Sequence, residues 1–196
     1  GHVGGWTTPI TGVNGEVYVV GVTFDFVRVV KIIKSVDGGM SFGTADTISG
    51  DHHPADVEVV AGAILGVSVP VVAVDKSLSP RRGTVYASWQ SDALGDADIV
   101  CRRSTNGGAA WGPIIRVNTD SLSNHRDQFH HWMTVDDSGW VDLVFLDRRN
   151  DSANLFCDAY FAQSRDGGLT FKNYRLTAQN FDPRLYPSQS ARLGDY

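Results

Sequence analysis

The stretch Ser35-Val36-Asp37-Gly38-Gly39-Met40-Ser41-Phe42 returns twice further along the chain, as Ser104–Trp111 and Ser164–Phe171. All three copies have a serine, an Asp or Asn two residues later, two glycines, and an aromatic ring at the end. A Ser or Thr precedes the ring, with one lapse at Ala110. An octapeptide that returns at a near-equal period indicates a repeat protein in which each repeat is one supersecondary unit.

The shared Asp or Asn is Asp37, Asn106 and Asp166, so the spacing is 69 and then 60 residues. Asp-Gly-Gly and Asn-Gly-Gly supply the positive φ angles that tight hairpin turns need. The side-chain oxygen can accept N–H groups of its own turn. We therefore expect these three residues to be structural, each in a hairpin turn with the closing ring packed beneath it.

Patterns typical of β-strands surround each copy. Three such runs precede the second copy, at Val69–Asp75, Thr84–Gln90 and Asp98–Ser104, and a short one follows it. The third copy has the same surroundings, and the first is less regular. The sequence predicts four-stranded units at about 6–50, 69–118 and 131–177, and the start of a fourth at about 190–196.

The repeated octapeptide resembles the Asp box of the sialidase (BNR-repeat) superfamily. The resemblance implies an all-β, sialidase-like β-propeller in one domain, with three four-stranded blades that make up about half of a six-bladed propeller. An arc of three blades leaves two sheet faces open, so missing blades or a second chain are expected to close it.

Composition excludes some classes of partner. Seventeen basic and 22 acidic side chains give a net charge of -5 with no run of like charges, so nucleic acid is not an expected partner. The most apolar stretch, Val57–Val74, contains Glu58, two glycines and a proline, and it predicts strands and no membrane span. Cys101 and Cys157 are interpreted as two buried strand thiols, with a disulfide as the alternative.

The end of the propeller opposite the Asp boxes is the expected working face, because function on such a fold lies in loops. Its loops are rich in Arg, Asp and His: 50–54 onward, 91–96, 120–131, 147–154 and 178–193. One interpretation makes an arginine a bidentate clamp for the carboxylate of an acidic sugar. The residues of this expected anion pocket are Arg126, Asp147, Arg148, Arg149 and Arg192.

Other roles for the same loops remain open. Arg148 and Arg149 can instead pair with Asp147, Asp151 or Asp158 and lock their loop. Carboxylate and amide oxygens of Asp147, Asn150, Asp151 and Asn154 offer a calcium site as a third alternative; no other cofactor is expected.

The same face carries two histidine pairs, at 52–53 and 130–131. Neighbouring strand residues point opposite ways, so each pair is expected to offer at most one imidazole inward. His131 is kept as a ligand candidate, and Trp132 beside it is assigned to packing between blades or to stacking on a sugar ring.

The resemblance to sialidases leaves two functions open. Sialidases use three arginines, an Asp acid/base, and a Tyr nucleophile assisted by a Glu. This sequence has only Glu16 and Glu58, and the motif that supplies the first arginine is not recognisable. We expect an extracellular or periplasmic module for non-catalytic recognition of a glycan or a surface. The alternative is a sialidase-type exo-glycosidase whose remaining catalytic residues lie outside this chain.

Overall fold

A computed structural model describes residues 7–23, 28–52, 54 and 69–183, and it contains three four-stranded antiparallel sheets. Each sheet is a meander in which strands adjacent in sequence are paired. Blade 1 comprises β1 (Thr8–Thr11), β2 (Val17–Val22), β3 (Val30–Ser35) and β4 (Asp46–Thr47). Blade 2 comprises β5 (Val71–Val74), β6 (Val85–Ser91), β7 (Asp98–Ser104) and β8 (Ile114–Arg116). Blade 3 comprises β9 (Gln128–Val135), β10 (Val141–Asp147), β11 (Asp158–Ser164) and β12 (Lys172–Arg175).

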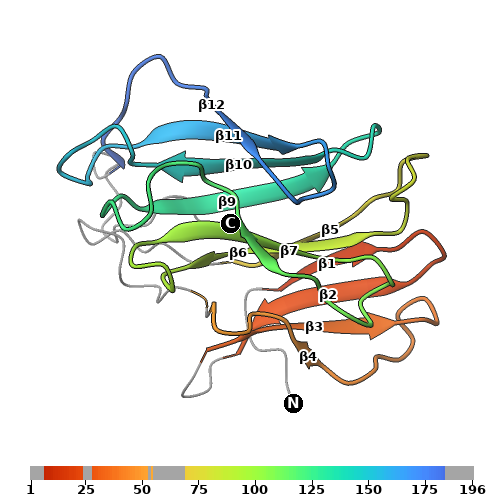
Figure 1. Ribbon diagram of the computed structural model, residues 1–196. Helices are drawn as coiled ribbons and strands as arrows, with labels where there is room; N and C mark the ends of the chain where they lie inside the picture. Colours follow the sequence, from red (N-terminus) through yellow and green to blue (C-terminus); the bar gives the residue numbers. More distant parts are fainter. Residues whose placement is uncertain (1–6, 24–27, 53, 55–68, 184–196) are drawn as a thin grey trace.

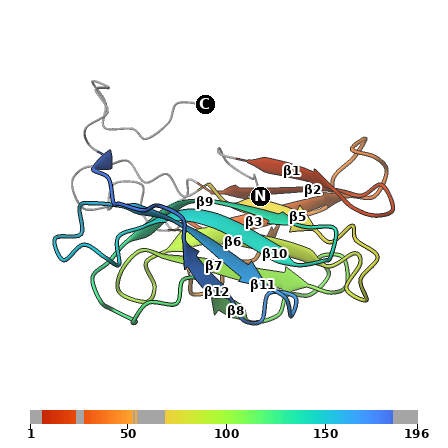
Figure 2. The same cartoon turned by 90° about the horizontal axis from the view of Figure 1, so that it is seen from above.

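The three blades are stacked in chain order, with blade 3 at the top of Figure 1 and blade 1 at the bottom. Their first strands, β1, β5 and β9, contact one another in turn. In the view from above, β1 and β9 lie toward one side of the stack, while β8 and β12 lie on the other (Figure 2). The first strands therefore form the inner edge of an arc, which is the arrangement of propeller blades.

Two apolar clusters hold the blades together. One joins blades 1 and 2 and contains Val20, Ile32, Val74 and Trp89 among others. The second joins blades 2 and 3. Because blade 2 lies between two others, every residue of β5 and β6 is buried, whereas β10 in blade 3 alternates between buried and more exposed positions. Burial on both faces agrees with the continuous apolar run of β5, whereas β6 also buries Ser88, Gln90 and Ser91.

The face of blade 3 that points away from blade 2 carries an apolar row across all four strands. Trp132, Val144, Phe161 and Tyr174 are paired in register from β9 to β12. Trp132 is 58% exposed and Val144 is 44% exposed. Trp132 therefore lies on the face of the sheet. The equivalent residue of blade 2 is Val71, which is buried between blades 2 and 3.

The Asp boxes form the turns between the third and fourth strands of each blade. In the first, Asp37 accepts hydrogen bonds from the backbone N–H and the hydroxyl of Ser41, at 2.9 and 2.6 Å. Thr170 makes the same two contacts with Asp166, at 3.0 and 2.6 Å. Of these two contacts, Asn106 keeps the one with the backbone N–H, which Ala110 donates at 2.8 Å, because Ala110 has no hydroxyl. All six box glycines have a positive φ.

These contacts also set the acidity of the box carboxylates. Partial burial would raise the pKa of Asp166, but hydrogen bonds from Thr170, Ser164 and the turn backbone outweigh it and hold the pKa at about 2. Hydrogen bonds from Ser35 and Ser41 lower the pKa of Asp37 in the same way. Both carboxylates are therefore acceptors throughout the physiological pH range.

Other expectations have mixed outcomes. Strand β9 begins at Gln128, three residues before the expected start of blade 3 at 131. The expected fourth blade at 190–196 and most of Val57–Val74 lie outside the described residues. Cys101 and Cys157 are both free and buried, so the disulfide alternative is wrong. In the part of the chain that the structure describes, no helix is long and apolar enough to cross a membrane.

We predict that Asp166→Ala lowers the free energy of unfolding by about 1 to 2 kcal/mol, because four donors of the turn lose their acceptor. Urea unfolding followed by circular dichroism measures the change. Asp137→Ala, in an exposed turn, is the matched control and should change the free energy by less than about 0.5 kcal/mol. An equal effect of the two substitutions would contradict a structural role for the box.

Candidate functional site

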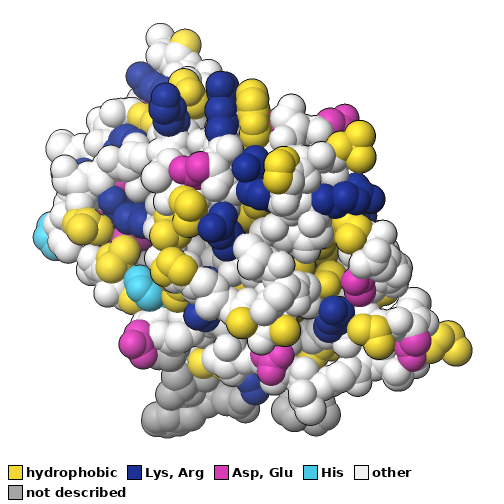
Figure 3. Space-filling model, turned by 45° about the vertical axis from the view of Figure 1, so that its right-hand side comes forward, with side chains coloured by type: hydrophobic (Ala, Val, Ile, Leu, Met, Phe, Trp, Pro, Cys, Tyr) yellow, Lys and Arg dark blue, Asp and Glu magenta, His cyan; other side chains and the backbone are white. Residues whose placement is uncertain are grey.

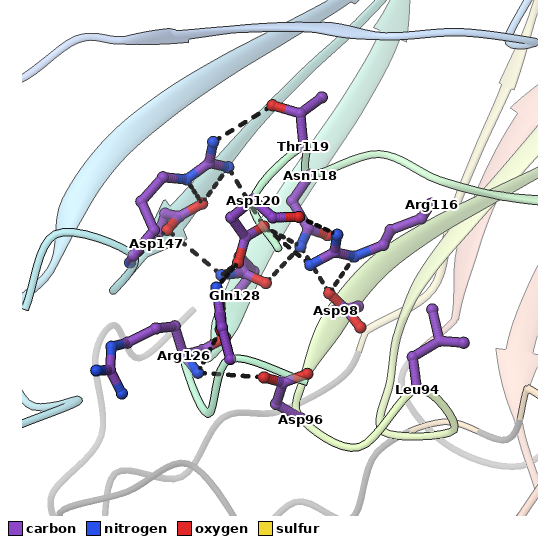
Figure 4. Close-up of polar contacts among 12 residues, drawn as sticks. Leu94, Asp96, Asp98, Arg116, Asn118, Thr119, Asp120, Arg126, Gln128 and Asp147 are labelled. Atoms are coloured by element: carbon purple, nitrogen blue, oxygen red, sulfur yellow. Dashed lines mark hydrogen bonds and ion pairs between the residues drawn. The ribbon is translucent and has the colours of Figure 1, made fainter. Parts of the chain in front are cut away.

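Polar side chains gather at the end of the sheets opposite the Asp boxes, between blades 2 and 3 (Figure 4). They come from strand ends and from the loops that follow them. Asp98 begins β7, Arg116 ends β8, Gln128 begins β9 and Asp147 ends β10. The connection from β8 to β9 adds Asn118, Asp120 and Arg126. Antiparallel pairing brings these positions together, because the end of one strand and the start of the next lie at the same end of the sheet.

Arg116 and Asn118 join blade 2 to the connection that leads into blade 3. Arg116 Nε lies 2.5 Å from Asp98 Oδ1, and its Nη2 lies 2.9 Å from Asp120 Oδ1. The amide of Asn118 donates to Asp98 at 2.6 Å and to Gln128 Oε1 at 2.5 Å. The network satisfies one oxygen of Asp98, and the other has no hydrogen-bond partner among the described residues.

Arg149 and Asp147 form the second half of the network. The guanidinium of Arg149 contacts Asp147 Oδ2 through Nε at 2.8 Å and through Nη2 at 2.6 Å. The same Nη2 lies 3.8 Å from Asp120 Oδ1. The guanidinium also stacks on the ring of Tyr160, 4.2 Å from its centroid. Arg149 and Asp147, both candidates for the anion pocket, are thus bound to each other.

Arg148 is directed into the protein. Its side chain is fully buried, lies over the ring of Phe129 at 4.9 Å, and pairs with Asp127 at 3.5 Å. Its Nε lies 3.4 Å from Cys157 Sγ. The alternative in which the two arginines lock their loop therefore describes the observed contacts, although Arg148 uses Asp127, a partner that the sequence did not indicate.

Burial governs the acidity of the two innermost carboxylates. Desolvation raises the pKa of Asp98, and the hydrogen bonds from Asn118 and Arg116 only partly offset it. Desolvation likewise raises the pKa of Asp147 against the opposing effect of Arg149. Both carboxyls have no exposed surface, so the arginine contacts are what make their charged forms tolerable.

The side chains expected to bind calcium form hydrogen bonds with other groups of the protein. Asp151 accepts the backbone N–H groups of Leu155 and Phe156 at 2.7 and 2.8 Å. Asn150 donates to Asp158, and Asn154 donates to Asp127. Within the described ranges, no group of three or more His, Cys, Asp or Glu side chains is placed to hold a metal ion. A calcium site at these residues stays a prediction.

The histidine pair at 130–131 lies at a β-bulge that the sequence did not reveal. The pairing of β9 with β10 shifts between Val144 and Leu146, and His130 has a φ of 51°. The bulge breaks the strict alternation expected for neighbouring residues. Instead of reaching the loop face, His131 is only 8% exposed, and its Nε2 has no hydrogen-bond partner among the described residues.

The remaining candidates are Arg126 and Arg192. The guanidinium of Arg126 points away from the network in Figure 4 and donates to the carbonyl of His125 at 2.8 Å. Arg192 lies outside the described residues, so its expected convergence with Arg126 stays a prediction. The sequence analysis did not single out Arg116, Asn118, Asp120 and Gln128 as members of the site. The signal that could have found them is the polar residue at or just after the end of several predicted strands.

We predict that Arg149→Met lowers the free energy of unfolding by about 3 kcal/mol at pH 7, because it leaves the buried carboxylate of Asp147 without its cation. The loss should shrink as the pH is lowered toward the raised pKa of Asp147, since a protonated carboxyl needs no cation. Arg175→Met, whose 40% exposed side chain pairs with Asp158, is the control and should cost about 1 kcal/mol or less. Chemical unfolding at pH 7 and pH 5 measures both variants.

A second prediction concerns pH. Burial lowers the pKa of His131 from 6.5 to about 4, against a hydrogen bond to the Ser88 backbone. Below pH 6.5 the unfolded chain takes up a proton that the folded chain refuses until about pH 4, so this group reduces stability by up to about 3 kcal/mol over that interval. His131→Gln should remove this part of the pH dependence, and the exposed control His125→Gln should leave it unchanged. Parallel curves for the wild type and His131→Gln would contradict the assignment.

No family model matches this sequence, and no curated protein matches it. Solved structures do match. A Hadza microbial sialidase superposes with a TM-score of 0.57 at 14% identity, over 86% of this chain and 36% of its own. The α-L-arabinofuranosidase Arb93A of Fusarium graminearum gives 0.58 at 13% identity, over 90% and 49%. An α-L-arabinanase of Penicillium chrysogenum, complexed with arabinobiose, gives 0.58 at 13% identity, over 90% and 52%.

These matches show the fold. The described residues have the sialidase-like β-propeller fold, in three four-stranded blades, as the sequence predicted. It spans between about a third and a half of the length of the proteins it matches.

Proposed function

We propose that this half of a sialidase-like propeller recognises a glycan or a glycan-bearing surface without cleaving it, in an extracellular or periplasmic protein. The location rests on resemblance to the sialidase superfamily. The observation that carries the binding role is the contrast between Arg126 and its three neighbours at the loop end. Arg116, Arg148 and Arg149 form ion pairs with carboxylates of the chain, whereas the Arg126 guanidinium donates a hydrogen bond to the backbone carbonyl of His125 and acts on the carboxylate of Asp151 through its charge.

Arg126 is held in a rigid surround that supports a binding role. Its backbone N–H donates to Asn124 at 2.9 Å and to Asp96 at 3.2 Å. The next residue, Asp127, accepts from the amide of Asn154 at 2.7 Å, which fixes the connection to the neighbouring loop. A guanidinium presented from a fixed backbone suits the carboxylate of an acidic sugar, because the two planar groups can form paired hydrogen bonds.

The distribution of carboxylates supports a role without catalysis. Glu16 lies in the turn between β1 and β2, where its Oε2 accepts the backbone N–H of Asn14, at the same end as the Asp boxes. Glu58 lies outside the described residues. Asp98 and Asp147 have no exposed side-chain surface and are each paired with an arginine. A sialidase-type reaction needs an exposed acid and an assisted nucleophile at one site.

An exo-glycosidase completed by sequence outside this chain is the second candidate. The observation in its favour is the pair Asp96 and Asp98 at the loop end, each with one carboxylate oxygen that lacks a hydrogen-bond partner among the described residues. Burial raises the pKa of Asp98, which is the direction a general acid needs. Release of nitrophenol from an aryl sialoside or an aryl α-L-arabinofuranoside, lost in Asp98→Asn, would favour this candidate over the first.

We predict that Arg126→Met weakens binding of N-acetylneuraminic acid roughly 10- to 100-fold, the value of one charge-assisted hydrogen bond of about 1.5 to 3 kcal/mol. Isothermal titration and ligand-observed NMR measure the affinity, with arabinobiose as a neutral sugar that the substitution should not affect. Arg165→Met is the matched control, because Arg165 is an exposed arginine at the opposite end, stacked on Trp140 at 4.0 Å. Equal losses in the two variants, or no binding of either sugar, would overturn the proposal.

A further inference from the structure

Side chains from equivalent positions of one blade reach the Asp box of the next at both described junctions. Lys34 Nζ donates to the carbonyl oxygen of Gly107 at 3.0 Å, and Arg103 Nη1 donates to the carbonyl oxygen of Gly167 at 2.6 Å. Gly107 and Gly167 are the first glycines of the second and third boxes. Lys34 and Arg103 hold the same place in their own blades, directly before the box serine. The end of the molecule that carries these cations is brought forward in Figure 3, where dark blue side chains lie among yellow ones.

A tyrosine accompanies each cation. Tyr18 is the cross-strand partner of Lys34, and Tyr86 is the cross-strand partner of Arg103. Tyr18 Oη donates to the carbonyl of Gly107 at 3.3 Å. Each ring also packs beneath the second box glycine of the next blade: a Cβ added at Gly108 would lie 3.6 Å from Tyr18, and one added at Gly168 would lie 3.2 Å from Tyr86.

The box of blade 1 has the same turn, but no described residue covers it. A Cβ added at Gly38 would meet nothing within 4 Å, whereas one at Gly107 would lie 3.2 Å from Lys34 Nζ. The closing aromatic rings show the same contrast. Phe171 is 8% exposed within the cluster between blades 2 and 3, and Trp111 packs against the cluster between blades 1 and 2. The equivalent Phe42 is 42% exposed.

We propose that the Asp box is the docking element by which each blade binds the blade before it, and that the exposed box of blade 1 binds a further blade bearing such a tyrosine–cation pair. The first glycine carbonyl accepts the Lys or Arg, the second glycine admits the tyrosine ring, and the closing aromatic fills the apolar junction. The docking surface on blade 1 consists of Gly38, Gly39 and Phe42, together with Val19 and Ile33 on the face turned away from blade 2.

The tyrosine–cation pair identifies the occupant. In blade 3 the equivalent cross-strand pair is Asp142 and Gln163, and the Gln163 amide donates to Asp142 at 3.0 Å. Blade 3 of a second copy therefore offers neither the ring nor the cation that the exposed box would receive. Because this chain spans at most about half of the proteins it matches, we assign the occupant to a further blade of the same polypeptide, outside these 196 residues.

Amide hydrogen exchange tests the docking contact inside the chain. Lys34→Met should raise exchange about tenfold at Gly108 and Ala110, in the box of blade 2, and leave Gly39 and Ser41 in its own neighbouring box unchanged. Arg103→Met should act in the same way on Gly168 and Thr170 of blade 3. Gln163→Met is the control, because no box follows blade 3 among the described residues, and it should change exchange at none of these amides. Exchange raised mainly in each variant's own box would overturn the proposal.

A gain of association tests the exposed box. The double variant Asp142→Tyr with Gln163→Arg gives blade 3 the missing pair, so it should form a discrete dimer in sedimentation velocity at concentrations where the wild type does not. Phe42→Asp, added to the double variant, should abolish that dimer. Two outcomes would overturn the proposal: no gain of association in the double variant, or a wild-type dimer that Phe42→Asp dissolves, which would make a second copy the natural occupant.

Discussion

A four-stranded sheet with apolar side chains on both faces is stable only when both faces are covered, because the hydrophobic gain scales with the apolar surface removed from water. Blade 2 meets this condition, since its inner strands β5 and β6 are buried throughout between blades 1 and 3. Within the described ranges, blades 1 and 3 each have one face covered by another blade. This constraint explains why blade 2 is the most buried of the three blades. It also explains why the apolar row across blade 3 and the ring of Phe42 in blade 1 are exposed.

The two ends of the arc are held by different interactions. At the loop end, charged side chains are buried with their partners, and the ion pairs of Arg116 and Arg149 tie blades 2 and 3 to the connection between them. At the other end, the turns are held by neutral and charge-assisted hydrogen bonds to backbone groups. Buried ion pairs are costly when one partner is lost, so the loop end is rigid as long as the network is complete. Among the labelled side chains of Figure 4, Arg126 lies at the rim of that network and its guanidinium points away from it.

Much of the fold could be predicted from the sequence because turn chemistry is local. Asp37, Asn106 and Asp166 need only their own turns, so an octapeptide carries enough information to place them, and alternation then assigns the strands around them. Asp147, the partner of Arg149, is two residues away and was among the carboxylates that the sequence offered, but the partner of Arg148 could not be chosen in the same way. Which carboxylate an arginine contacts depends on how two loops from different strands face each other. Arg148 and its partner Asp127 are twenty-one residues apart in the sequence. The bulge at His130 was equally hidden, since one extra residue in a strand leaves no compositional mark.

The contacts with the Asp boxes run in one direction: at both described junctions, a cation at the end of the third strand of one blade reaches forward to the box of the next blade. An arrangement of this kind is directional, because each blade contacts its two neighbours through different residues. The blades are therefore not interchangeable, although they share one architecture. Gly167 illustrates this, because the space above it is filled by Arg81 and Arg103 of blade 2. A blade that is duplicated or moved during evolution would have to keep its own box and its own tyrosine–cation pair matched to two different neighbours. The part that must be inherited together is therefore the junction, which consists of the pair of one blade and the box of the next.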